Sequence, residues 1–132
     1  RESDGRLARY NLASGEKTLL LESGSESIME PALSPDDRWL AFVLGKSDGR
    51  VAMCLAPLHG NGAAAMEKDW IVLFEQDRFL GSPAWSPDGS FLFFVSELGG
   101  PCSVWVQKLE PGSKKPDGDS GSFTAPRKPV ST

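Results

Sequence analysis

Three aspartates in two short phrases are the first candidates for chemistry. The phrases are SPDD at 34–37 and SPDG at 86–89. Neighbouring carboxylates with different pKa values can serve as a general acid and a general base. Ser, Pro, Asp and Gly in this order are also what a type I turn favours, so turn formation explains the aspartates fully. We therefore expect structural turns and no catalytic group, the turn residues being Ser34, Pro35, Asp36, Asp37, Ser86, Pro87, Asp88 and Gly89.

A second candidate is the stretch GDSGS at Gly118–Ser122. It resembles the nucleophile loop of trypsin-type serine proteases, in which a histidine must activate the serine. The chain has one histidine, His59, and its surroundings do not resemble the histidine segment of those proteases. We interpret Gly118–Ser122 as a Gly/Ser turn and His59 as a surface loop residue.

Metal and cofactor chemistry find little support in the residue types. Two cysteines and one histidine are too few for a structural zinc site, and the Asp117-x-Asp119 spacing lacks the rest of a calcium loop. The sequence has neither a Gly-rich phosphate loop nor a G-x-S-x-G elbow. We expect no cofactor and no metal. Cys54 and Cys102 permit one disulfide without requiring it, and we expect both to pack as small apolar side chains.

Composition excludes several classes of partner. The chain has 132 residues, a net charge of −4 and no basic cluster longer than a pair, so the positive surface that nucleic acid requires is missing. The apolar runs are far shorter than the roughly 18 residues that span a bilayer, so we expect no membrane span. An apolar content of 39% is enough for a folded core. The compartment stays open, with bacterial periplasm and cytoplasm both possible.

One longer phrase occurs twice and indicates the elements that position the turns. PALSPDDRWLAF at 31–42 returns as PAWSPDGSFLFF at 83–94. After each turn comes an apolar run, 39–43 and then 91–95, whose residues are apolar at consecutive positions, which predicts strands buried on both faces. Phe42 and Phe93 are the expected core aromatics. The fourth turn position is Asp37 in one copy and Gly89 in the other, and Asp tolerates a positive φ less well than Gly.

The repetition extends beyond this phrase. Stretches that end in Leu and a Gly turn occur three times, at 7–15, 53–62 and 104–112, and further strands are expected at 18–21 and 70–74. The repeating unit is therefore four antiparallel strands, with the Ser-Pro-Asp turn joining the first to the second. The only candidate helix is a turn or two within 60–69. The four tryptophans lie at predicted strand positions, which favours packing in the core over stacking on a ligand. They are Trp39, Trp70, Trp85 and Trp105.

The repeats resemble the WD40-like Pro-Asp repeat of TolB-type β-propellers. That motif is matched by Trp85 to Gly89 with Phe93 and Phe94, and less fully by Leu33 to Asp37 with Phe42. The resemblance implies an all-β fold of propeller-like blades and no catalytic residue of the motif itself. Residues 1–110 then form a partial propeller, with half a blade at 5–22, a blade at 28–75 and a blade at 82–110. Residues 111–132 form a Pro/Gly/Ser-rich tail that can add one outer strand, with Phe123 docking.

Two and a half blades cannot close a ring, since closed propellers have about 4 to 8. We expect the chain to be a fragment of a larger protein, or one that associates through its exposed blade edges. The predicted function is a non-catalytic repeat module whose partner is another protein or another domain of the same parent. The alternative is an accessory propeller of a bacterial prolyl-oligopeptidase-type serine hydrolase, which a downstream G-x-S-x-G domain would support.

Overall fold

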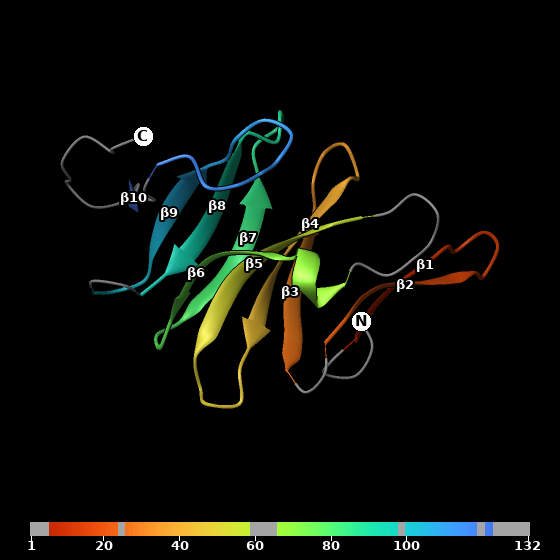
Figure 1. Cartoon of the computed structure of the whole chain (residues 1–132), viewed down its shortest axis with the longest axis horizontal. Coiled ribbons are helices and arrows are strands. Elements are labelled where there is room, and N and C mark those ends of the chain that lie inside the picture. The colour runs from red at the N-terminus through yellow and green to blue at the C-terminus, as the bar shows by residue number, and fades with distance from the viewer. Residues whose placement is uncertain (1–5, 24–25, 59–65, 98–99, 119–120, 123–132) are drawn as a thin grey trace.

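The computed structural model describes residues 6–23, 26–58, 66–97, 100–118 and 121–122, and these form three antiparallel sheets (Figure 1). The first sheet contains β1 (Arg6–Tyr10) and β2 (Lys17–Glu22). The second has the order β3 (Ser27–Leu33), β4 (Trp39–Gly45), β5 (Val51–Pro57) and β6 (Ile71–Gln76). The third contains β7 (Leu80–Trp85), β8 (Phe91–Ser96), β9 (Ser103–Lys108) and β10 (Gly121–Ser122).

The all-β prediction is confirmed, and the sheets do not close a ring. The expected strand at 18–21 lies within β2, whereas the strand expected at 70–74 begins at Ile71 and runs to Gln76. Within the described residues the helical content is one 3-10 turn, η1 (Glu67–Asp69). β10 lies in the tail and pairs with β9, and Phe123 falls outside the described residues.

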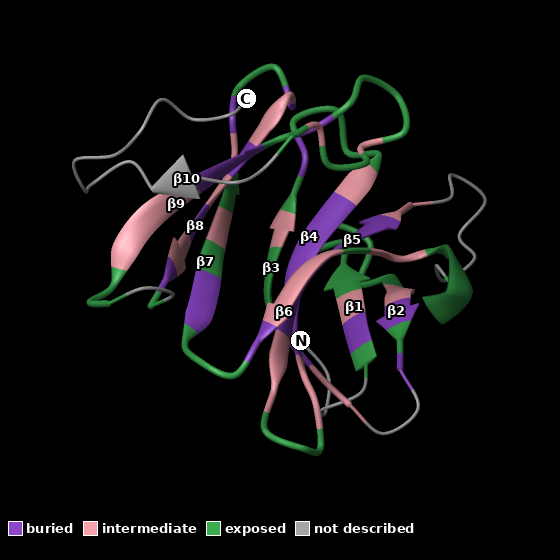
Figure 2. Cartoon of the chain, turned by 60° about the vertical axis from the view of Figure 1, so that its left-hand side comes forward, coloured by how far each residue is buried: buried purple, intermediate pink, exposed green. Residues whose placement is uncertain are grey.

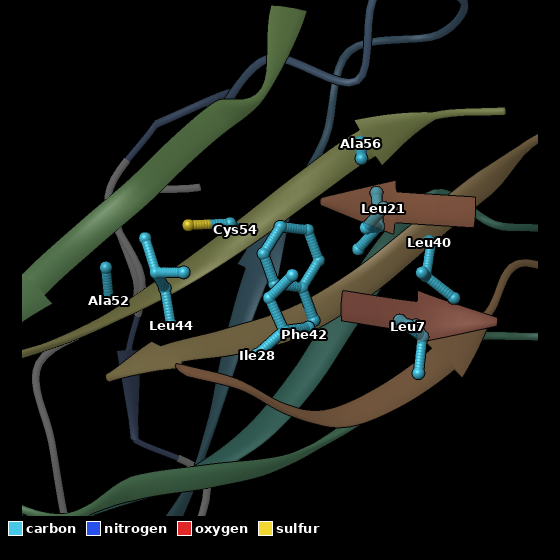
Figure 3. Close-up of a cluster of buried hydrophobic side chains, with 9 residues drawn as sticks. All are labelled: Leu7, Leu21, Ile28, Leu40, Phe42, Leu44, Ala52, Cys54 and Ala56. Atoms are coloured by element: carbon cyan, nitrogen blue, oxygen red, sulfur yellow. The ribbon is translucent and has the colours of Figure 1, made fainter. Parts of the chain in front are cut away.

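Both faces of β4 are covered, because its sheet lies between the other two (Figure 2). Leu40, Phe42 and Leu44 belong to a cluster that Leu7 and Leu21 complete from the first sheet, and Figure 3 shows the side chains of this cluster. The alternate residues of β4 face the third sheet in a second cluster. The burial of β4 on both faces that the apolar run predicts is therefore confirmed.

The same prediction is wrong for β8. Leu92 and Phe94 are buried against the second sheet, but Phe91, Phe93 and Val95 are only half-buried. β8 belongs to the last sheet of the stack, so its other face has no further sheet among the described residues. The core aromatic equivalent to Phe42 is thus Phe94 and not Phe93.

Candidate functional site

The turn at Ser34–Asp37 joins β3 to β4 and is held by one buried hydroxyl. The Asp37 N–H donates to the Ser34 carbonyl at 2.9 Å, as in a β-turn. Ser34 Oγ donates to Asp36 Oδ1 at 2.6 Å and accepts from the Trp39 N–H at 3.0 Å. Asp36 Oδ1 also accepts from the Arg38 N–H at 3.0 Å. These bonds lower the pKa of Asp36, with the Ser34 bond contributing most, so the carboxylate stays ionised as part of its own turn.

The turn at Ser86–Gly89 repeats this arrangement between β7 and β8. Ser86 Oγ donates to Asp88 Oδ1 at 2.8 Å and accepts from the Phe91 N–H at 3.0 Å. Ser90 adds its hydroxyl, which donates to Asp88 Oδ1 at 2.7 Å, and its N–H donates at 3.0 Å. With the Ser90 hydroxyl as the largest cause, the pKa of Asp88 is lowered to about 2. Each carboxylate therefore serves as an acceptor for its own turn, which suits a structural role better than proton transfer.

The fourth position of both turns requires a left-handed backbone. Asp37 has a φ of +61° and Gly89 a φ of +75°. Glycine adopts this region without strain, whereas aspartate does so at some cost. The glycine also leaves room for a lysine, since a Cβ at position 89 would lie 3.3 Å from Lys114 Nζ.

Lys114 contacts the second turn directly. Its Nζ donates to the Gly89 carbonyl at 2.8 Å and lies 5.9 Å from the centre of the Trp85 ring. The ammonium also contributes electrostatically to the lowered pKa of Asp36 on the neighbouring turn. We call the edge formed by 34–38, 86–90 and 110–115 the turn edge. It is a polar, charged surface whose side chains are held in fixed positions by a hydrogen-bonded backbone.

A second set of contacts ties the second sheet to the third. Glu30 Oε1 accepts from the Ser82 N–H at 3.0 Å, and Trp85 Nε1 donates to the Ala32 carbonyl at 2.9 Å. Glu30 and Ser82 occupy equivalent bulges of β3 and β7, with φ values of +50° and +53°. A Cβ at Gly81 would lie 2.5 Å from Glu30 Oε2, so glycine permits this close approach. We call the contacts among Glu30, Ala32, Gly81, Ser82 and Trp85 the seam.

Sequence reasoning missed the seam residues Glu30 and Ser82, and it also missed Lys114. Glu30 and Ser82 are 52 residues apart in the chain, which is the offset of the repeated phrase, so they lie at equivalent positions of two repeats. This offset is the sequence signal that could have predicted contact between β3 and β7. Nothing in the sequence distinguishes Lys114 from the adjacent Lys115.

The structure does not combine the other candidates into a site. His59 and Asp119 fall outside the described residues. Asp117 lies on the surface, where its Oδ2 atom is 3.8 Å from Lys108 Nζ. Cys54 and Cys102 are free thiols. Cys54 packs as a small apolar side chain, as expected, and burial raises its pKa to about 12. The same expectation is wrong for Cys102, which is exposed because it lies in the connection before β9 and not in a strand.

Three further findings concern metals, membranes and the tryptophans. No group of three potential ligands for a metal ion occurs in the part of the chain that the structure describes. Among the same residues, no helix is long and apolar enough to cross a membrane. All four tryptophans pack against the two core clusters, as the packing interpretation predicts; they are Trp39, Trp70, Trp85 and Trp105.

The comparisons with known proteins agree with the repeat pattern at a coarse level. Over 84 residues the chain is 32% identical to the Tol-Pal system protein TolB of Alcanivorax borkumensis. The match covers 64% of this chain and 18% of that TolB, so the chain corresponds to a small part of its relative. No protein-family model matches the chain. The similarity supports a TolB-like propeller relationship and no finer assignment.

Proposed function

We propose that this chain is a non-catalytic, propeller-like repeat module that binds protein, either a separate partner or further domains of a larger parent. Within this proposal, residues 5–22 form half a blade, 28–75 one blade, 82–110 another and 111–132 a tail. The similarity to TolB and the sheets stacked with repeated turns support it. The observation that carries the proposal is the outer face of the third sheet.

The outer face of the third sheet is the side that points away from the second sheet. Phe91 and Val95 alternate along β8 with the buried Leu92 and Phe94, so they lie on the opposite face. Val104 lies opposite Val95 on β9 and shares its face. These side chains are half-buried, which leaves an apolar surface that a protein partner can cover.

The second sheet indicates what such a face does when it is covered. By the offset of the repeat, Phe91 and Val95 correspond to Trp39 and Val43. Both of these residues pack in the cluster between the second and third sheets, where Val43 is only 1% exposed. The stack therefore extends naturally by adding another protein surface to the outer face of the third sheet.

Site-specific photo-crosslinking tests this proposal with the purified chain. Phe91 is replaced by the photoreactive benzoylphenylalanine, which keeps an aromatic side chain at the position. Val72 on β6 receives the same replacement as a matched control, because it is an apolar strand residue with 51% exposure outside the outer face. We expect irradiation to link copies of the chain through position 91, since an isolated apolar face associates with protein.

Two results would contradict the proposal. The first is the absence of covalent adducts from position 91 at any protein concentration. The second is an equal adduct yield from position 72, because collision alone then explains the linkage.

A further inference from the structure

A groove of about 270 Å³ lies at the opposite end of the stack, between the first and second sheets. Leu7, Ala8 and Arg9 line it from β1, and Leu20 from β2, while the second sheet adds the residues Pro31, Leu33 and Leu40. The lining is mainly apolar. This groove is distinct from the turn edge and from the outer face of the third sheet.

The groove continues the packed interface between the two sheets. Leu7 and Leu40 are 4% and 2% exposed and belong to the cluster that joins these sheets, and Leu20 packs against it. Leu33, by contrast, is 40% exposed at the rim. The buried contact between the sheets therefore opens into a groove whose wall still offers apolar surface.

The first sheet also has an unused edge. β5 pairs with β4 on one side and β6 on the other, whereas β1 pairs only with β2 among the described strands. A strand edge of this kind presents backbone donors and acceptors to another strand. The groove lies beside it, because β1 contributes residues to the lining.

The seam between the second and third sheets indicates the chemistry of an occupant. There, the strand that corresponds to β3 is β7, which packs against β3 and β4. The repeat places Leu33 at the position of Trp85, whose indole donates to a carbonyl of β3. It places Glu30 at the position of Ser82, whose N–H donates to a carboxylate. Among the described residues, the N–H of Glu30 has no such side-chain acceptor.

We propose that this groove binds a β-hairpin of the kind formed by β3 and β4. Its second strand adds to the edge of β1, and its first strand packs on Pro31 and Leu33. A carboxylate at the bulge of that first strand accepts from the Glu30 N–H, as Glu30 does for Ser82. Arg9 in the lining adds a positive charge that favours an acidic hairpin.

The probe that tests this inference is a fluorescein-labelled synthetic peptide with the sequence of residues 27–45, SIMEPALSPDDRWLAFVLG. Its binding to the full chain is followed by fluorescence anisotropy. We expect saturable binding that Leu33→Arg weakens at least about tenfold, because a charge is then placed against an apolar strand. Val72→Arg, at a similarly exposed apolar position outside the groove, is expected to bind as the wild type does. Unchanged melting temperatures establish that both variants are folded.

A peptide with lysine in place of its glutamate tests the carboxylate contact and is expected to bind more weakly than the original. The proposal is overturned if binding is not saturable, if Leu33→Arg and Val72→Arg weaken it equally, or if the lysine peptide binds as well as the original. The inference rests on the proposed function but fails separately from it. Peptide binding by a Phe91→Lys variant reports on the groove alone, whereas crosslinking from position 91 reports on the outer face.

Discussion

Two neighbouring phenylalanines on β8 provide a direct test of how the sheets stack. Phe94 points toward the second sheet and is 1% exposed, while Phe93 lies on the other face and is half-buried. Replacing each by alanine removes the same atoms from the same strand. The difference between the two variants therefore measures the packing on each face.

The expected magnitudes follow from burial. Phe94 packs against Phe74 with ring centroids 4.8 Å apart, inside the cluster between the two sheets. Truncating such a core aromatic costs about 3–5 kcal/mol in the free energy of unfolding. Part of the Phe93 side chain stays exposed to water in the folded state. Full burial of such a side chain contributes about 1.5–3 kcal/mol, so truncating Phe93 should lower the free energy of unfolding by about 1–2 kcal/mol.

Urea denaturation followed by tryptophan fluorescence measures both values. Phe42→Ala is the reference, because Phe42 is fully buried in the other cluster and should lose as much as Phe94→Ala. Equal losses for Phe93→Ala and Phe94→Ala would refute the assignment of the two faces, and a larger loss for Phe93→Ala would reverse it.

Three further predictions concern the turns and the seam. Gly89→Val should lower the melting temperature more than Asp37→Gly, because valine is strained at a φ of +75° whereas glycine relieves the φ of +61° at position 37; the reverse order would contradict the turn geometry. The folded-state pKa of Asp88 is lowered from 3.8 to about 2, so its contribution to stability is present above pH 3.8 and lost as the pH falls toward about 2. The melting temperatures of the wild type and Asp88→Asn should therefore converge as the pH is lowered through this range, and a constant gap would argue against the hydrogen bonds of Asp88. Glu30→Ala should lower the free energy of unfolding measurably, though less than a core truncation, because it leaves the Ser82 N–H without its acceptor. An unchanged urea midpoint would show that the contact between Glu30 and Ser82 does not contribute to stability.

The turns and strands were predictable because their signals are local. Ser-Pro-Asp fixes the chain reversal through one dihedral and two side-chain hydrogen bonds, and the apolar run after it predicts a strand. The repeated phrase then gave the pairing of these strands within each sheet. The positive φ at Asp37 was also foreseeable, because the second copy has glycine there.

The sequence does not reveal which sheets are neighbours, and the features that depend on this stacking could not be predicted. The consecutive apolar residues of β8 predict burial on both faces, but the burial of Phe93 depends on whether another sheet follows. The contact between Glu30 and Ser82 arises from the stacking of two repeats and has no local signal. Lys114 reaches Gly89 from a turn 25 residues away, so its role appears only in three dimensions.

The central claim is that the outer face of the third sheet binds protein, and the solution mass of the chain tests it most directly. Light scattering coupled to size exclusion is measured over a range of concentrations for the wild type and Phe91→Lys. The account predicts a wild-type mass that rises with concentration to a discrete multiple of 14.2 kDa, and a Phe91→Lys mass that stays at 14.2 kDa. A wild-type mass of 14.2 kDa at every concentration, or association that Phe91→Lys leaves unchanged, would contradict it.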